Sequence, residues 1–170
     1  MKNITLLLML LSLKFVAQNH AFKINPIGFF NNGIEGSYEN YIGNNQSIEI
    51  VVGLATLNRF GNNNDVNILG IEARYKFFLN KKDTFKGLYL TPVGTLIRTS
   101  EDNSKRYTIL GLGGLVGYQF MLGQKNQTSG FIFDLNLGLS NYFSSANSNP
   151  NVNNISGLQT RFGASLGYAF

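Results

Sequence analysis

The chain contains no cysteine and no tryptophan, and it has one histidine and three prolines in 170 residues. The absence of cysteine excludes disulfides and thiolate metal sites, and no other metal-ligand or cofactor motif appears. Charged residues make up only 14% of the chain, where about a quarter is usual. The net charge of +5 is small and no long basic run exists, which argues against a nucleic-acid-binding protein.

The N-terminus carries a short apolar segment. Lys2 precedes the apolar run 4–13, and Ala17 offers a small residue before a cut. This order predicts a secretory signal peptide over residues 1–17. The run is shorter than the roughly 20 apolar residues that cross a bilayer; the alternative is a buried N-terminal helix. We therefore expect one mature domain over residues 18–170, with the exact cleavage site left open.

The C-terminal segment 158–170, LQTRFGASLGYAF, has the most informative pattern. Alternate residues are mostly apolar and end in Leu166, Tyr168 and Phe170, while the residues between them are small or polar. Because side chains of a strand point alternately to opposite faces, this pattern predicts a strand with one apolar and one polar face.

Similar alternation recurs along the chain, separated by turn signals such as GNNQ at 43–46. Pro26 weakens the first segment, and Pro92 is expected to mark a bulge. The facing of the segment 87–99 stays open, because both of its faces are apolar. The expected strands are 21–30, 33–42, 47–57, 67–79, 87–99, 106–122, 131–143 and 158–170.

Strands of about 9–11 residues with one apolar and one polar face are typical of transmembrane β-barrels. The apolar faces carry almost no charge, whereas a soluble barrel such as a lipocalin needs a charged outer face and an apolar cavity. The sequence therefore predicts an all-β fold, an eight-stranded antiparallel transmembrane β-barrel. A soluble lipocalin-like ligand carrier is the less favoured alternative.

The polar faces place charged residues inside the predicted barrel, where the lumen is just wide enough for side chains. Opposite charges there are expected to pair, and Glu49 is expected to meet Arg74 and Lys76. Such pairs predict a closed interior; a narrow ion or small-solute channel is the alternative. Arg98 is a further candidate base. The predicted interior charges are Glu35, Glu39, Glu49, Glu72, Arg74, Lys76, Asp134 and Arg161.

The terminal strand, with its final Phe170, resembles that of small outer-membrane barrels of the OmpA/OmpX type. The segments GIEGSYENYI (33–42) and GLYLTPVG (87–94) are similar to parts of small, uncharacterised barrel proteins of Gram-negative bacteria. The resemblance implies an outer-membrane location, in contact with membrane lipid and lipopolysaccharide. It also implies that Leu166, Tyr168 and Phe170 form the signal that the barrel-assembly machinery reads.

The sequence predicts no catalysis. Barrel enzymes that modify lipids use a histidine with a serine, and the single His20 is expected to lie ahead of the first strand. The expected role is structural or surface-interacting, with an extracellular ligand possible through the loops 58–66 and 144–157. A lipid-modifying barrel enzyme is a less favoured alternative.

Overall fold

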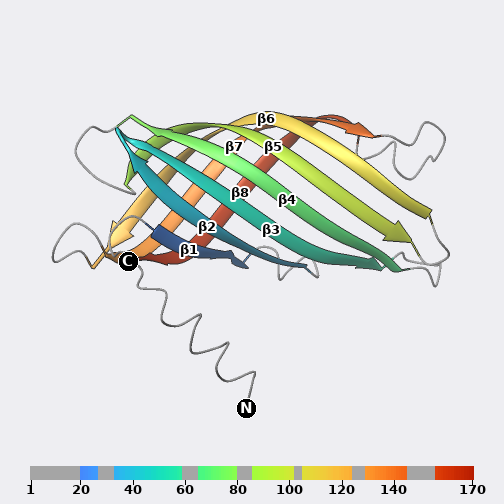
Figure 1. Cartoon of the computed structure of the whole chain (residues 1–170), viewed down its shortest axis with the longest axis horizontal. Helices are drawn as coiled ribbons and strands as arrows, with labels where there is room; N and C mark the ends of the chain where they lie inside the picture. The colour runs from blue at the N-terminus through green and yellow to red at the C-terminus, as the bar shows by residue number, and fades with distance from the viewer. Residues whose placement is uncertain are drawn as a thin grey trace, which may run out of the picture.

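The protein is described by a computed structural model for residues 20–26, 33–58, 65–79, 86–101, 105–123, 129–144 and 156–170. The predicted signal peptide, 1–17, lies outside these residues, as do most of the predicted loops 58–66 and 144–157. The strands close into one antiparallel barrel (Figure 1), so the predicted all-β, eight-stranded antiparallel barrel is confirmed. The strands are β1 (His20–Asn25), β2 (Gly33–Gly43), β3 (Gln46–Asn58), β4 (Asp65–Phe78), β5 (Gly87–Glu101), β6 (Lys105–Leu122), β7 (Gly130–Ser144) and β8 (Gly157–Ala169).

The barrel closes where the first strand pairs with the last. Every strand is hydrogen-bonded to its neighbour in the sequence, and β1 and β8 form a seam of four residue pairs, from Ala21 opposite Ala169 to Ile24 opposite Leu166. The end where β1 begins and β8 ends also holds the tight β2–β3 turn, and we call it the turn end. The opposite end, where β1, β3, β5 and β7 end, is the loop end.

Strand β1 ends at Asn25, directly before Pro26. Proline has no N–H to donate to a strand ladder, which explains the early end; the predicted continuation over 27–30 lies outside the described residues. The expectation that His20 precedes the first strand is wrong, because His20 is the first residue of β1. Its Nδ1 lies 2.7 Å from the Tyr38 hydroxyl oxygen, and the two rings stack.

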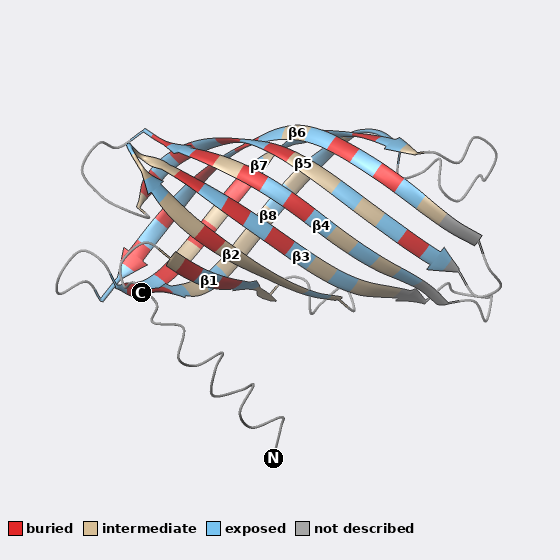
Figure 2. Ribbon diagram, viewed as in Figure 1, coloured by how far each residue is buried: buried red, intermediate tan, exposed pale blue. Residues whose placement is uncertain are grey.

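Side chains alternate between the lumen and the outer surface, as the red and pale blue bands in Figure 2 show. On β7, Ile132, Asp134 and Asn136 are buried in the lumen, while Phe131 and Leu137 are exposed on the outside. This is the period of two that a strand imposes on its side chains. The outer surface is consequently apolar and much of the lumen is polar.

The β2–β3 turn is the tight turn that the GNNQ signal predicts. Asn44 and Asn45 have φ angles of 53° and 62°, in the left-handed region that asparagine tolerates better than most residues. A turn with two successive residues of positive φ has a twist that matches the right-handed twist of the flanking strands. The turn leads into a register that places Glu39 directly opposite Glu49.

The predicted bulge at Pro92 is wrong. Arg74 pairs with Val93 and Phe77 pairs with Leu90, so the β4–β5 register is the same on both sides of the proline. Pro92 is exposed on the outer face. Its missing N–H leaves a gap in the ladder toward β4 without adding a residue to either strand.

The facing of β5, which the sequence leaves open, is set by packing in the lumen. Tyr89 and Val93 are buried inside the barrel, while the alternate leucines point outward, with Leu90 50% exposed. Arg98 shares the outward face and is exposed, so the suggestion that it adds a fourth interior base is wrong. Both faces of β5 are apolar because the lumen contains apolar layers as well as charges.

One such apolar layer lies at the turn end. Ala21, Met121, Ile132 and Ala169 form a buried cluster, and Tyr41 packs against it. The layer covers the lumen between the chain ends and the charged residues further in.

Within the described residues, no helix is long and apolar enough to cross a bilayer.

Candidate functional site

Five charged side chains meet in the lumen next to the apolar layer, and we call Lys23, Glu39, Glu49, Lys76 and Asp134 the plug. The Lys23 Nζ lies 2.7 Å from Glu39, 2.6 Å from Glu49 and 2.9 Å from Asp134, measured to carboxylate oxygens. The Lys76 Nζ lies 3.3, 3.1 and 2.7 Å from oxygens of the same three carboxylates. All five residues are buried, so each ammonium group bridges three carboxylates away from water.

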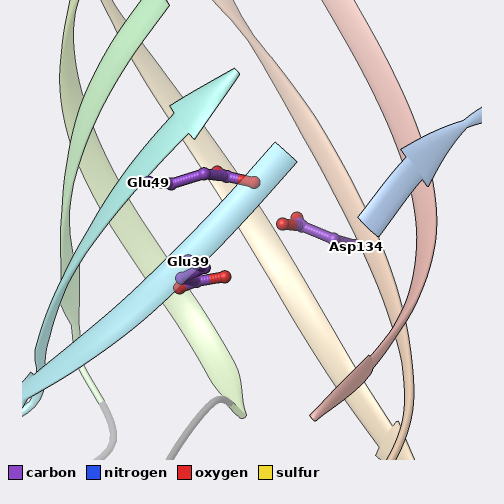
Figure 3. Close-up of side chains that lie close together, drawn as sticks. All are labelled: Glu39, Glu49 and Asp134. Atoms are coloured by element: carbon purple, nitrogen blue, oxygen red, sulfur yellow. The ribbon is translucent and has the colours of Figure 1, made fainter. Parts of the chain in front are cut away.

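Strand register explains how the plug assembles. Glu39 on β2 lies opposite Glu49 on β3, and Glu49 lies opposite Arg74 on β4. Lys76 follows Arg74 by two residues and therefore points to the same side. Asp134 on β7 approaches from across the lumen, and Figure 3 shows its carboxylate pointing toward those of the two glutamates.

Neutral side chains complete the hydrogen bonding of the plug. The Tyr89 hydroxyl donates to Asp134 over 2.6 Å, and the Tyr89 ring centroid lies 4.5 Å from the Lys76 Nζ. The Gln119 Oε1 accepts from Lys76 at 3.1 Å and from Lys23 at 3.5 Å. Each glutamate also accepts from a serine hydroxyl; these serines are Ser37 and Ser47.

A second group, which we call the triad, lies nearer the loop end and consists of Glu72, Arg74 and Arg161. The Arg74 Nε and the Arg161 Nη1 each lie 2.6 Å from a different oxygen of Glu72. Thr95 donates to Glu72 over 2.6 Å. The Arg74 Nη1 also lies 3.5 Å from Glu49, which joins the triad to the plug.

The charges of the plug and the triad balance. Removing a charge from water is costly unless it is paired and hydrogen-bonded, and here the two signs are equal in number. The network ties together strands from opposite sides of the barrel, which closes the lumen across its width. The acids are Glu39, Glu49, Glu72 and Asp134, and the bases are Lys23, Lys76, Arg74 and Arg161.

The three carboxylates of the plug lie close enough together to be considered as metal ligands. One oxygen from each of Glu39, Glu49 and Asp134 lies within 4.8 Å of the other two, a spacing that a divalent cation could bridge. Lys23 and Lys76 already supply two cationic groups to the same oxygens. The carboxylates therefore have their counter-charges within the protein, and we assign no metal to them.

The structure brings most of the predicted interior charges together. Glu35 differs from the others, because it is half-buried and accepts a hydrogen bond from Asn25 over 3.3 Å. The sequence reasoning missed Lys23, although its apolar neighbours Phe22 and Ile24 signal that Lys23 faces the lumen. The predicted residues that join the plug or the triad are Glu39, Glu49, Glu72, Arg74, Lys76, Asp134 and Arg161.

The residues of the predicted assembly signal share the outer face of the C-terminal strand at the turn end. Leu166 and Tyr168 are each 46% exposed. The Phe170 ring centroid lies 5.7 Å from that of Phe22 across the seam, and the two rings stack. Their role in assembly stays a prediction.

The lumen contains a cavity of about 290 Å³ between the triad and the loop end, and we call it the cup. Glu35, Glu72, Arg74 and Arg161 contribute to its lining together with apolar side chains. A second hollow of about 580 Å³ shares part of this wall and continues to Thr56 and Asn67 near the loop end. The lumen is therefore filled near the turn end. Its other half contains the cup beside β2, β3 and β4, and a buried cluster of Ile109 and Tyr142 on the side of β6 and β7.

No family model, curated protein or solved structure matches the chain. The resemblance to OmpA/OmpX-type barrels accordingly stays a prediction.

Proposed function

We propose that the chain is a β-barrel of the Gram-negative outer membrane, with an interior closed by charged side chains and no catalytic activity. Its role is structural or surface-interacting, and it contacts its surroundings through the loop end. Membrane lipid and lipopolysaccharide are its expected neighbours. The barrel-assembly machinery is its expected partner during insertion.

The observation that carries this proposal is the inverted polarity of the barrel. Large apolar side chains are exposed on the outside of every strand, whereas soluble proteins rarely expose apolar patches above a few hundred Å². Charged residues of soluble proteins lie mostly at the surface, whereas in this barrel they are gathered in the interior and paired with one another. Here the fully or nearly buried charged residues are Lys23, Glu39, Glu49, Glu72, Arg74, Lys76 and Asp134.

Most of the aromatic side chains that are exposed on the outer face lie near the turn end, with Phe143 and Phe162 as exceptions, and this distribution supports a membrane interface at the turn end. Outer-membrane barrels carry aromatic girdles where their apolar band meets the headgroups. The rings of this girdle contact one another, for example Phe120 with Tyr118 and Phe133. Exposed aromatic residues near this end are Phe22, Phe77, Tyr118, Phe120, Phe131 and Tyr168.

The sequence supports the outer membrane in particular. The expected signal peptide 1–17 implies export, and the terminal Phe170 with Leu166 and Tyr168 resembles the assembly signal of this membrane. A closed barrel also pairs its strands with one another without water, as a bilayer requires.

The positions of the polar residues favour a role without catalysis. His20 lies on the outer face, where it contacts Tyr38, and it does not reach the lumen charges. The buried carboxylates are engaged by lysine and arginine, which leaves them poorly placed to transfer protons. The loops 58–66 and 144–157 both belong to the loop end and are our candidates for contact with an extracellular ligand.

Gel mobility of the outer-membrane fraction tests the location and the closed barrel together. We expect the protein to fractionate with the outer membrane and to migrate differently in SDS when it is boiled and when it is not. The barrel resists cold SDS because all its strands are paired in a closed sheet. A soluble periplasmic protein without a mobility shift would contradict the proposal and favour a lipocalin-like carrier.

The plug predicts that the barrel does not conduct. We expect no single-channel steps from the purified protein in planar lipid bilayers, because the plug and the apolar layer both cross the lumen. The control is a conducting porin under the same conditions. Stable steps that change when Glu72 is replaced by glutamine or Arg74 by methionine would instead establish the narrow-channel alternative.

A further inference from the structure

The cup forms where two residues of its wall, Gly53 and Gly70, are glycines and leave space that a side chain would fill. A Cβ placed on Gly53 would have its nearest neighbours at 3.9 Å, and one on Gly70 at 4.0 Å. Both glycines face the lumen and line the cup. Protein interiors are normally packed without voids of this size, so the empty space next to these two residues needs an explanation.

Other lumen glycines have the opposite surroundings. A Cβ on Gly111 would overlap the Tyr142 ring, and one on Gly117 would overlap the Tyr89 ring. On that side of the barrel, glycine makes room for a large side chain from the next strand. Near Gly53 and Gly70 no side chain of the described residues takes up the space that glycine leaves.

Arg161 offers hydrogen-bond donors to the cup. Its guanidinium group has five N–H donors, and both of its contacts within the described residues use Nη1, to Glu72 at 2.6 Å and to Ser140 at 3.4 Å. Its side chain is 22% exposed and belongs to the cavity wall. The remaining guanidinium nitrogens suit a carboxylate, which accepts two parallel hydrogen bonds.

Glu35 offers acceptors to the same cavity. Its Cγ lies 3.9 Å from the Cβ position of Gly53, so its side chain runs along the cup wall. Among the described residues it accepts one hydrogen bond, from Asn25, and it is attracted by the Arg74 guanidinium group, whereas a carboxylate can accept about four hydrogen bonds. Glu35 is therefore suited to hold an ammonium group.

Apolar side chains complete the wall between these two charged groups. Val51, Ile68, Ile97 and Tyr142 all line the cup. Sites for small molecules commonly combine a mainly apolar lining with a few polar groups that fix orientation. The cup has this composition, and its Arg161 guanidinium group and Glu35 carboxylate both have hydrogen-bonding capacity left for a ligand.

We propose that the cup binds a small zwitterion with an apolar group, of the class of apolar amino acids and short peptides. Arg161 binds its carboxylate, Glu35 binds its ammonium group, and the apolar wall contacts its side chain. The site depends only on the lumen, so it goes beyond the proposed membrane role and does not require it.

Calorimetric titration of the purified protein in a maltoside detergent tests the proposal. The probe is the dipeptide leucyl-leucine, and the matched control is the same dipeptide acetylated at its N-terminus and amidated at its C-terminus. We expect saturable binding of the zwitterion and at least about tenfold weaker binding of the blocked form. No saturable binding up to about 10 mM, or equal affinity for both forms, would overturn the proposal.

Variants locate the site. Gly70→Val fills the cup and is expected to abolish binding, while Gly114→Val is the control, since Gly114 faces outward with nothing within 4 Å of its Cβ position. Glu35→Gln is expected to weaken the dipeptide but not the blocked form. Gel mobility confirms folding of each variant. If Gly70→Val does not fold, the affinity of Glu35→Gln for the dipeptide provides the test. Unchanged affinity in the folded variants would overturn the assignment to the cup.

Discussion

Replacing Lys76 with methionine is expected to lower the free energy of unfolding by about 3–5 kcal/mol. The Lys76 Nζ lies within 3.3 Å of three buried carboxylates, and the variant leaves Lys23 as the one ammonium group among them. Removing one partner from a buried ion pair leaves charges without compensation in a site from which water is excluded. Chemical denaturation followed by circular dichroism measures the loss, because the chain has no tryptophan to report by fluorescence.

A double variant separates the charge effect from a packing effect. Asp134→Asn removes the carboxylate whose Oδ2 lies 2.7 Å from the Lys76 Nζ. Combined with Lys76→Met, it should cost less than the sum of the two single variants, by about 0.5–3 kcal/mol. Additive losses, or a loss below about 1 kcal/mol for Lys76→Met alone, would show that the plug is not an electrostatic unit.

Leu137→Arg is expected to cost about 2–4 kcal/mol if the outer face of β7 lies in the middle of a bilayer. Leu137 is 56% exposed and sits near the middle of the strand. An arginine there places a charge in hydrocarbon, where it finds neither water nor a partner. Denaturation from lipid vesicles measures the difference.

The matched control is Asn141→Arg, on the same strand and the same outward face but four residues closer to the loop end. It should cost only about 0–1 kcal/mol, because charges near the membrane interface are tolerated. If both arginines change the stability by less than about 0.5 kcal/mol, the outer face is in water and the membrane proposal fails.

Strand number and facing follow from sequence wherever one face is clearly polar. β7 alternates Phe131, Phe133 and Leu135 with Asp134 and Asn136, so period two determines which side faces inward. The sequence does not settle β5, because its inward Tyr89 and outward Leu90 are both apolar. Only the packing of Tyr89 against the plug distinguishes the two faces.

The site was partly predictable for a related reason. Acidic and basic residues on the polar faces had to meet in a narrow lumen, and Glu49 does contact Arg74 and Lys76 as expected. The cup could not be predicted, because the effect of a glycine depends on the strand beside it. Gly117 and Gly53 look alike in the sequence, yet one is filled by a neighbouring ring and the other is open.

The four-pair seam between β1 and β8 determines the order in which the protein can be built. Ala21 pairs with Ala169, so nearly the whole chain must be available before the barrel can close. Contacts between such distant segments form slowly, and until then the first and last strands each present an unpaired edge. We therefore expect the seam to be the last contact made during folding, and we expect loss of the final residues to leave an open sheet that is prone to associate with other chains.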